Sequence, residues 1–425
     1  MPAQKLPVEP TAPTVSISLG KKFEYGPTVL QPDVPIVVGP DGSKSTTEEA
    51  VTALDVLDKF KGTFAGFGFN TIFRPNSKTT KTTSELKNKP TDNETDNLLQ
   101  LNLTAETMVF DKPLGNVPNR GLEDQADINL NGIPYTQSIV DAMPLPPGHT
   151  VPVIHFEPGL WMRVPAVDTF PKLPASYARM ASIPHGTTIN AQCFEEAKTS
   201  PDAPKFGKAL ITPITLGVNG QETGNFTFLN QDVKNNNTRR LPQDLTDFIN
   251  DGTITQEILD NPNLILENAN KDKKIIDHTT FTVSTMPRDN DFGGGTSNIG
   301  FLVGKDKSTF TAASVGGQSG NANAVKVTAQ YWISTVRAEA QIPPSKKSDY
   351  KIVSANPTSK DPREAIPTIL IDEDVSSATT LKFTYNQIQY SQDVSLDFMG
   401  VRWPHITVST LAPTGLLYSE LKKGN

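Results

Sequence analysis

The chain has few of the side chains that form covalent or metal-based cross-links. Among its 425 residues there are 1 cysteine and 5 histidines. The lone cysteine, Cys193, allows no internal disulfide and no zinc site built from several cysteines. Residues 1–5 also lack the apolar run of a secretory signal. We therefore expect a cytoplasmic protein.

Long apolar runs and clusters of positive charge are missing as well. No apolar run approaches the roughly 18 residues that a membrane-spanning helix needs. The net charge is -7, whereas a nucleic-acid-binding protein usually carries a basic patch. We therefore expect neither a membrane nor a nucleic acid among the partners of this chain.

The signatures of common enzyme classes do not occur either. The sequence has no G-x-S-x-G elbow, no P-loop and no H-E-x-x-H motif. The three glycines at 293–295 are followed by no lysine, so a turn is favoured there over a phosphate- or calcium-binding loop. Cys193 and His185 could form a nucleophilic pair, but a small buried cysteine is the commoner arrangement.

Proline is the residue type present in excess. The chain has 35 prolines in 425 residues, or about 8%, where about 5% is usual. Because proline lacks an N–H group and clashes inside a helix, prolines spread along the chain favour short extended segments. Alternation of apolar and polar residues predicts strands in many of these segments. They are 62–73, 99–103, 133–139, 152–164, 177–183, 187–192, 208–213, 225–229, 277–286, 297–303, 323–336, 379–396 and 403–411.

Helical spacing is limited to two segments. The first is 45–60, where Ser45 and Glu48 resemble a capping box. The second is 241–268, which Pro262 must interrupt. Many strands and few helices predict a mainly β protein, a large antiparallel β-barrel of the lipocalin type with a helical insertion.

The predicted domain organisation is simple. Residues 1–22 are rich in proline, serine and threonine and form an extended arm. Residues 23–425 form a single elaborated β-barrel domain with the helical insertion at about 241–275, and two barrels split near residue 240 are the alternative. Because the arm has no core of its own, a neighbouring subunit could order it, which would make the protein a homo-oligomer.

Polar residues of the strand over 152–164 form the first candidate site. By alternation His155 and Glu157 share one face, and Trp161 and Arg163 follow them on that face. Such groups are costly inside a barrel unless they contact a ligand or one another. If peroxide is the substrate, His155 or Arg163 could be the catalytic residue, as an acid and a charge stabiliser. A satisfied structural network is the alternative interpretation.

The second candidate is His405, near the start of the last strand. A single imidazole that points into a barrel can hold a haem iron as its axial ligand. A lone histidine in a strand is more often structural, so the residue by itself leaves both interpretations open.

Three segments resemble the nitrobindin family of small haem-binding β-barrels. Residues 62–68 resemble its G-x-W-x-G-x-G opening strand, with Phe64 in place of the tryptophan. Residues 155–159 resemble its H-x-E-x-G segment. Residues 403–408, Trp-Pro-His-Ile-Thr-Val, resemble its closing strand, in which a histidine ligates the haem iron. The chain is much longer than members of that family, and residues 179–188 and 388–392 are similar to an uncharacterised group of longer proteins with a haem-binding label.

The resemblance implies haem as the cofactor, with His405 as the metal ligand. Iron held in this way would react with peroxide or diatomic gases, as in a haem peroxidase-like oxidoreductase. Gly66 and Gly68 would let a flat macrocycle approach the backbone. The residues expected to line the cofactor are Phe64, Gly66, Gly68, Glu157 and Trp161. Two further classes stay open: a non-enzymatic binding protein for a small lipophilic molecule, and a structural or self-assembling protein.

Overall fold

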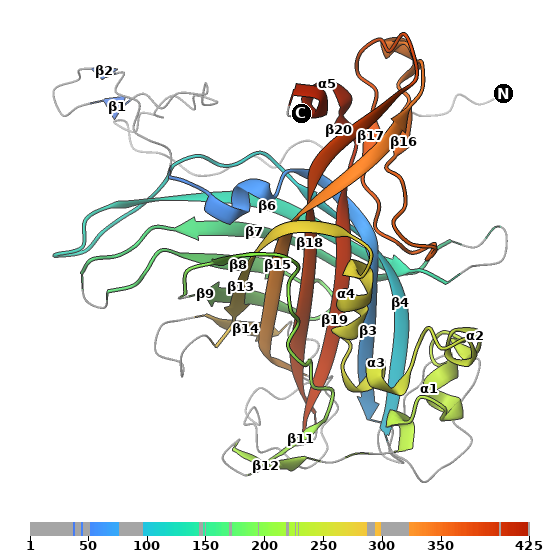
Figure 1. Ribbon diagram of the computed structural model, residues 1–425. Helices are drawn as coiled ribbons and strands as arrows, with labels where there is room; N and C mark the ends of the chain where they lie inside the picture. The colour runs from blue at the N-terminus through green and yellow to red at the C-terminus, as the bar shows by residue number, and fades with distance from the viewer. Residues whose placement is uncertain are drawn as a thin grey trace, which may run out of the picture. The chain divides into compact units, whose positions relative to one another are not determined.

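A computed structural model gives the fold of the chain (Figure 1). It describes residues 37–38, 44–45, 52–75, 97–143, 148, 150–169, 172–193, 195–217, 221–225, 227, 229–286, 294–298, 323–398 and 401–423. The chain divides into two compact units, Met1–Val51 and Thr52–Asn425. In the first unit, β1 (Val37–Val38) pairs antiparallel with β2 (Lys44–Ser45). The arm expected over 1–22 lies outside the described residues.

Ten long antiparallel strands among the described residues close into one β-barrel in the second unit. Ser284 of β13 faces Gln192 of β9, and this pairing closes the barrel. Strands from both sides of residue 240 therefore share one barrel, and the prediction of a mainly β, antiparallel barrel is confirmed. In their order around the barrel, the strands are β13 (Lys274–Ser284), β15 (Asn323–Ile342), β18 (Thr379–Phe398), β19 (Val401–Thr414), β3 (Gly62–Pro75), β4 (Asn97–Phe110), β6 (Ile128–Asp141), β7 (Val153–Val164), β8 (Ser176–Ser182) and β9 (Thr187–Cys193).

Shorter strands extend the barrel wall or lie beside it. A separate three-stranded sheet consists of β16 (Ile352–Ser354), β17 (Thr368–Leu370) and β20 (Leu416–Leu417). The C-terminal helix α5 (Tyr418–Lys423) follows β20 directly. The strands that pair with barrel strands are β5 (Val117–Asn119), β10 (Lys198–Pro201), β11 (Ile214–Leu216) and β14 (Gly295–Asn298), and β12 (Glu222–Asn225) pairs with β11.

Two predicted strands are wrong. Of the described residues in 225–229, only Asn225 lies in a strand, and Leu229 begins a 3-10 helix. Residues 208–213 have irregular backbone, and the chain enters a strand only at β11. The N–H group of Ala209 donates to the side chain of Asn261 over 3.0 Å, and Asn263 donates to the carbonyl of Gly207 over 2.8 Å. These bonds satisfy the backbone through the helical insertion, so the segment needs no neighbouring strand.

The helical segments are shorter than predicted. Within 52–60, the described part of the first one, there is a 3-10 helix, η1 (Asp55–Lys59). The second is confirmed as helical but consists of separate short helices, and Pro262 lies in the break between the last two. These helices are α1 (Asn236–Arg240), α2 (Thr246–Asn250), α3 (Gln256–Asp260) and α4 (Leu264–Asn270), with η2 (Leu229–Gln231) before them.

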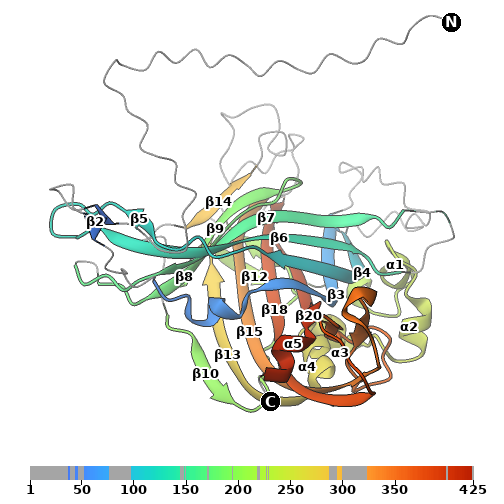
Figure 2. The same ribbon diagram turned by 90° about the horizontal axis from the view of Figure 1, so that it is seen from above.

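The two faces of the barrel wall have different neighbours. Inward side chains such as Phe64, Trp161 and Tyr331 form one core cluster, which Leu57 and Phe60 of the η1 region join. Outward side chains such as Phe69 and Trp332 pack against α2–α4 in a second cluster. A third covers the far ends of β15, β18 and β19 with β16, β17 and α5. The strands β6 and β7 run across the direction of β15 and β18 (Figure 2). Inside the barrel, the ring of Trp161 on β7 meets that of Tyr331 on β15.

Candidate functional site

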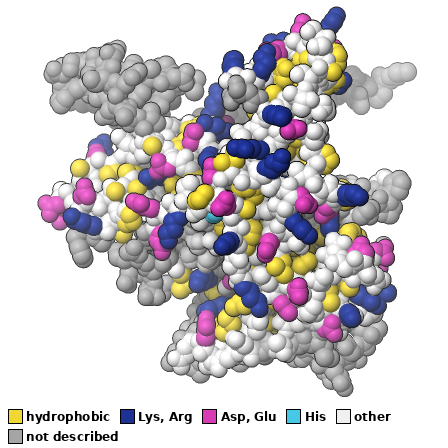
Figure 3. Space-filling model, viewed as in Figure 1, with side chains coloured by type: hydrophobic (Ala, Val, Ile, Leu, Met, Phe, Trp, Pro, Cys, Tyr) yellow, Lys and Arg dark blue, Asp and Glu magenta, His cyan; other side chains and the backbone are white. Residues whose placement is uncertain are grey.

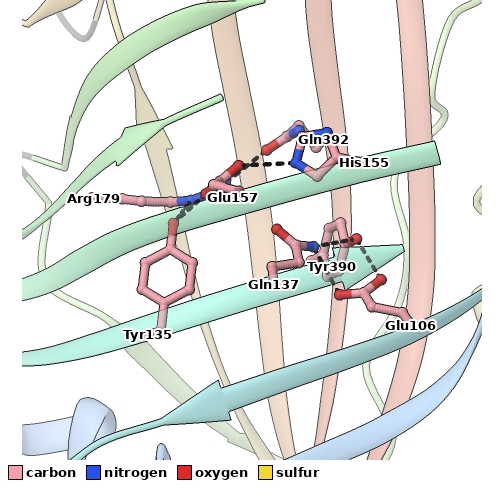
Figure 4. A network of polar contacts seen from close by, with 8 residues as sticks. All are labelled: Glu106, Tyr135, Gln137, His155, Glu157, Arg179, Tyr390 and Gln392. Carbon is pink, nitrogen blue, oxygen red and sulfur yellow. Dashed lines mark hydrogen bonds and ion pairs between the residues drawn. The ribbon is translucent and has the colours of Figure 1, made fainter. Parts of the chain in front are cut away.

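A buried ion pair lies inside the barrel, on two adjacent strands. Arg179 of β8 donates from Nη2 to Oε1 of Glu157 on β7 over 2.6 Å. The same guanidinium donates from Nε to the hydroxyl of Tyr135 and from Nη1 to Oε1 of Gln392, over 2.8 and 2.6 Å. Tyr135 in turn donates to Glu157. Both charges of the pair therefore have several polar partners although water does not reach them (Figure 4).

The register of the strands explains how this network forms. Tyr135 of β6 is paired with Gly159 of β7, and a Cβ atom at position 159 would lie 2.5 Å from the Tyr135 ring. The glycine therefore leaves room for the ring to lie along β7 toward Glu157. Burial by itself would raise the pKa of Glu157, but the Arg179 guanidinium and the bonds from His155 and Tyr135 together outweigh it and lower that pKa to about 2.

A second carboxylate is buried without a cation. Glu106 of β4 accepts from Gln137 and from the hydroxyl of Tyr390, over 2.7 Å in both cases. Gln137 also donates to the Tyr390 oxygen over 3.0 Å. Burial raises the pKa of Glu106, and these hydrogen bonds offset only part of the effect. Tyr390 comes from β18, on the opposite wall, so the network ties the two walls together (Figure 4).

Three histidines gather at one end of the barrel interior. The rings of His155 and His185 meet edge to face with their centroids 4.9 Å apart, and His155 Nε2 lies 3.3 Å from Oε2 of Glu157. His405 lies close enough for both of them to lower its pKa. On β19, His405 alternates in phase with Ser409 and Leu411, and Leu411 belongs to the interior cluster. The His405 side chain therefore points into the barrel.

Among the described residues, His405 is the histidine of this group with an inaccessible nitrogen that has no partner. Its Nε2 atom is inaccessible and has no hydrogen-bond partner among the described residues. Burial, with the neighbouring His155 and His185, lowers the pKa of His405 to about 4, so the imidazole is neutral at pH 7. A buried neutral nitrogen without a partner can accept a hydrogen bond, donate one, or ligate a metal.

The structure brings only part of the expected site together. His155, Glu157 and His405 lie at the histidine end of the interior. Arg163 lies eight residues after His155 on β7, roughly 26 Å along the strand, and its Nε atom pairs with Asp55 of η1. Arg163 therefore does not join His155. The sequence alone suggested Arg163 as the basic residue near Glu157, but the structure has Arg179 there.

The residues expected to line a macrocycle lie in the barrel core. Trp161 is 1% exposed and meets the rings of Phe60, Phe281 and Tyr331 edge to face, at centroid distances of 5.7, 5.7 and 5.0 Å. Phe64 meets Phe110 edge to face at 5.8 Å. These contacts give both side chains a packing role.

The space beside the two glycines of β3 is also filled. A Cβ atom at Gly66 would lie 2.0 Å from the carbonyl oxygen of Thr410, and one at Gly68 would lie 2.4 Å from that of Val408. The glycines let β19 approach β3 closely. The expectation that they leave room for a flat ligand stays a prediction.

Cys193 and His185 do not form a pair. His185 lies in the turn between β8 and β9, whereas Cys193 ends β9, roughly 20 Å away along the strand. The Cys193 thiol donates to the carbonyl of Glu195, and burial raises its pKa. Cys193 is a buried core residue, the commoner of the two arrangements considered.

Sequence reasoning missed the polar residues that complete the interior networks. They are Glu106, Tyr135, Gln137, Arg179, Tyr390 and Gln392. The sequence did contain a signal for Arg179. Arg179 lies two residues from Tyr177 and two from Ala181, so it shares the buried face of the strand with these apolar residues.

Comparisons with known proteins give no assignment. No protein-family model matches the chain, and neither a curated protein nor a solved structure does. Among the described residues, no group of three or more histidine, cysteine, aspartate or glutamate side chains is arranged to hold a metal ion. None of the helices in the described ranges is long and apolar enough to span a membrane. On the face drawn in Figure 3, basic and acidic side chains are interspersed.

Proposed function

We propose that this chain is a binding protein that holds haem through Nε2 of His405. The observation that carries the proposal is the inward, half-buried and neutral imidazole, whose inaccessible Nε2 has no partner among the described residues. Leaving a buried polar atom without a partner costs free energy, on the order of 1–3 kcal/mol, which a ligand would recover. Haem needs only one such nitrogen from the protein, because the porphyrin supplies four others.

The remaining residues fit haem less well than His405 does. Gly66, Gly68, Phe64 and Trp161 are engaged in packing within the barrel wall and its core. The proposal is therefore confined to His405, with His155 and His185 beside it. Bound haem would supply an iron centre that can take a diatomic gas or peroxide. We propose binding and derive no reaction, because Arg163 lies at the opposite end of β7.

The test is a haemin titration of the purified protein. We expect one-to-one uptake and a Soret band of histidine-ligated haem in the wild type. His405→Ala should lose the band, and added imidazole should restore it by replacing the missing ligand. His278→Ala is the matched control, because His278 is buried on β13 and its Nδ1 lies 3.0 Å from the carbonyl of Asp202. Equal spectra for the wild type and His405→Ala would rule out this function.

A further inference from the structure

A cavity of about 190 Å³ lies on the outer side of the barrel wall. Leu103 of β4 and the helical residues Ile258 and Ile265 give it an apolar floor, and the segment 358–365 between β16 and β17 forms its rim. An apolar cavity of roughly 150 Å³ can hold benzene. This cavity is therefore large enough for a ring, or a short alkyl chain, with one small substituent.

Lys273 contributes the positive charge at this cavity. Its Nζ atom donates to Oε1 of Gln387 over 2.6 Å and, more weakly, to the carbonyl of Ala365 over 3.4 Å. Gln387 is itself held by Asn270 at the end of α4, over 2.8 Å. The ammonium group is therefore fixed in place by neutral oxygen atoms, and one of its three N–H donors has no partner in these bonds.

The carboxylates nearby are occupied by other groups. Asp361 pairs with Arg363, with Oδ1 3.2 Å from Nε. The Glu364 carboxylate accepts bonds from the backbone and hydroxyl groups of Thr358 and Ser359. Asp272 is exposed. Within the part of the chain that the structure describes, Lys273 has no ion pair, although Glu364 is a nearby charge. The residue is half-buried, and such a cation without a direct ion-pair partner is unfavourable.

We propose that this cavity binds a small aryl or alkyl carboxylate, whose apolar body rests on Leu103, Ile258 and Ile265 and whose carboxylate pairs with Lys273. The anion supplies the counter-charge that the protein lacks, and the apolar floor removes the hydrocarbon part from water. This site is independent of His405, which lies on the inner side of the wall.

The charge of Lys273 makes the binding depend on pH. Burial lowers the pKa of Lys273 to about 8, and Glu364 is the nearby charge that acts against this shift. Asp361 and Arg363 compensate each other, and Asp272 is in solvent. A carboxylate that binds the ammonium form should bind most tightly below pH 8, and its affinity should fall about tenfold per pH unit above it.

The experiment is a calorimetric titration with benzoate, using benzamide as a neutral ligand of nearly the same shape. For the wild type at pH 7, we expect benzoate to bind at least about tenfold more tightly than benzamide, since a hydrogen bond to a charged group contributes about 1.5–3 kcal/mol. Lys273→Met should abolish this preference. Lys274→Met, which removes the adjacent but exposed lysine, should keep it. Ala269→Trp should fill the cavity and block both ligands.

Three results would overturn the proposal: no benzoate binding by the folded wild type, equal affinity for benzoate and benzamide, or unchanged benzoate binding in Ala269→Trp. If Lys273→Met fails to fold, the pH profile of the wild type decides, because benzoate affinity that stays constant from pH 7 to 10 excludes Lys273 as the partner. Circular dichroism of every variant shows whether the barrel is intact.

Discussion

Arg179 and Glu157 form an ion pair inside the barrel, 2.6 Å from Nη2 to Oε1, with the two side chains 2% and 0% exposed. Neither charge can be removed alone without leaving the other buried and unpaired. Because the pair also bonds Tyr135 and Gln392, it connects β6, β7, β8 and β18. The stability of the barrel should therefore be sensitive to single substitutions of Arg179 or Glu157.

We expect Arg179→Met to lower the free energy of unfolding by about 3–5 kcal/mol, the usual effect of breaking a buried ion pair. The double variant Arg179→Met/Glu157→Leu should recover much of the loss, because no charge is then left unpaired. Urea unfolding followed by tryptophan fluorescence measures both. Arg120→Met is the control, since its partner Asp127 and Arg120 itself are 53% and 89% exposed and such pairs contribute less than about 1 kcal/mol. A double variant as unstable as Arg179→Met would contradict this account.

The same ion pair predicts how stability depends on pH. The pKa of Glu157 falls from 4.5 to about 2 in the folded chain. A depressed carboxyl pKa contributes stability that is complete above pH 4.5 and is lost as the pH falls toward 2. The contribution is on the order of 3 kcal/mol. Urea midpoints measured from pH 7 to pH 2 should show it, and Glu157→Gln should have a flatter profile below pH 4.5 although it is less stable at pH 7.

Much of the fold could be predicted because a strand has a period of two. Alternation located the ten barrel strands, and it placed His155 and Glu157 on the inner face. It did not find β16, β17 or β20, which are only two or three residues long. It was wrong for 208–213, where side chains of the helical insertion bond the backbone. It was also wrong for 225–229, where only Asn225 of the described residues lies in a strand.

The candidate site was harder to predict because it depends on strand register. Alternation correctly assigns a face, but it does not say which residue of the next strand lies alongside. Trp161 is paired with Arg179, and Tyr135 with Gly159, so the partners of Glu157 come from strands whose register no local pattern records. Distance along a strand matters in the same way, and it separates Arg163 from His155.

Substitutions of Trp161 test whether this residue belongs to the core or contacts a cofactor. The ring is buried among Phe60, Phe281 and Tyr331. We expect Trp161→Ala to lower the free energy of unfolding by about 3–5 kcal/mol, and Trp161→Phe to cost less because it leaves a smaller cavity. Haemin uptake by Trp161→Phe should equal that of the wild type at a temperature where both are folded. Loss of haemin binding with unchanged stability would instead make Trp161 a ligand contact.

The close approach of β3 and β19 gives the last prediction. A Cβ atom at Gly66 would lie 2.0 Å from the carbonyl oxygen of Thr410 and 3.0 Å from the Cα atom of Leu411. Both are backbone atoms, so the strands must move apart to admit a methyl group. We expect Gly66→Ala to lower the free energy of unfolding by about 1–3 kcal/mol, as overpacking does elsewhere. Gly207→Ala is the control, because nothing lies within 4 Å of its Cβ position. If Gly66→Ala were as stable as Gly207→Ala, the space beside Gly66 would be open, and this would favour a flat ligand lying against β3.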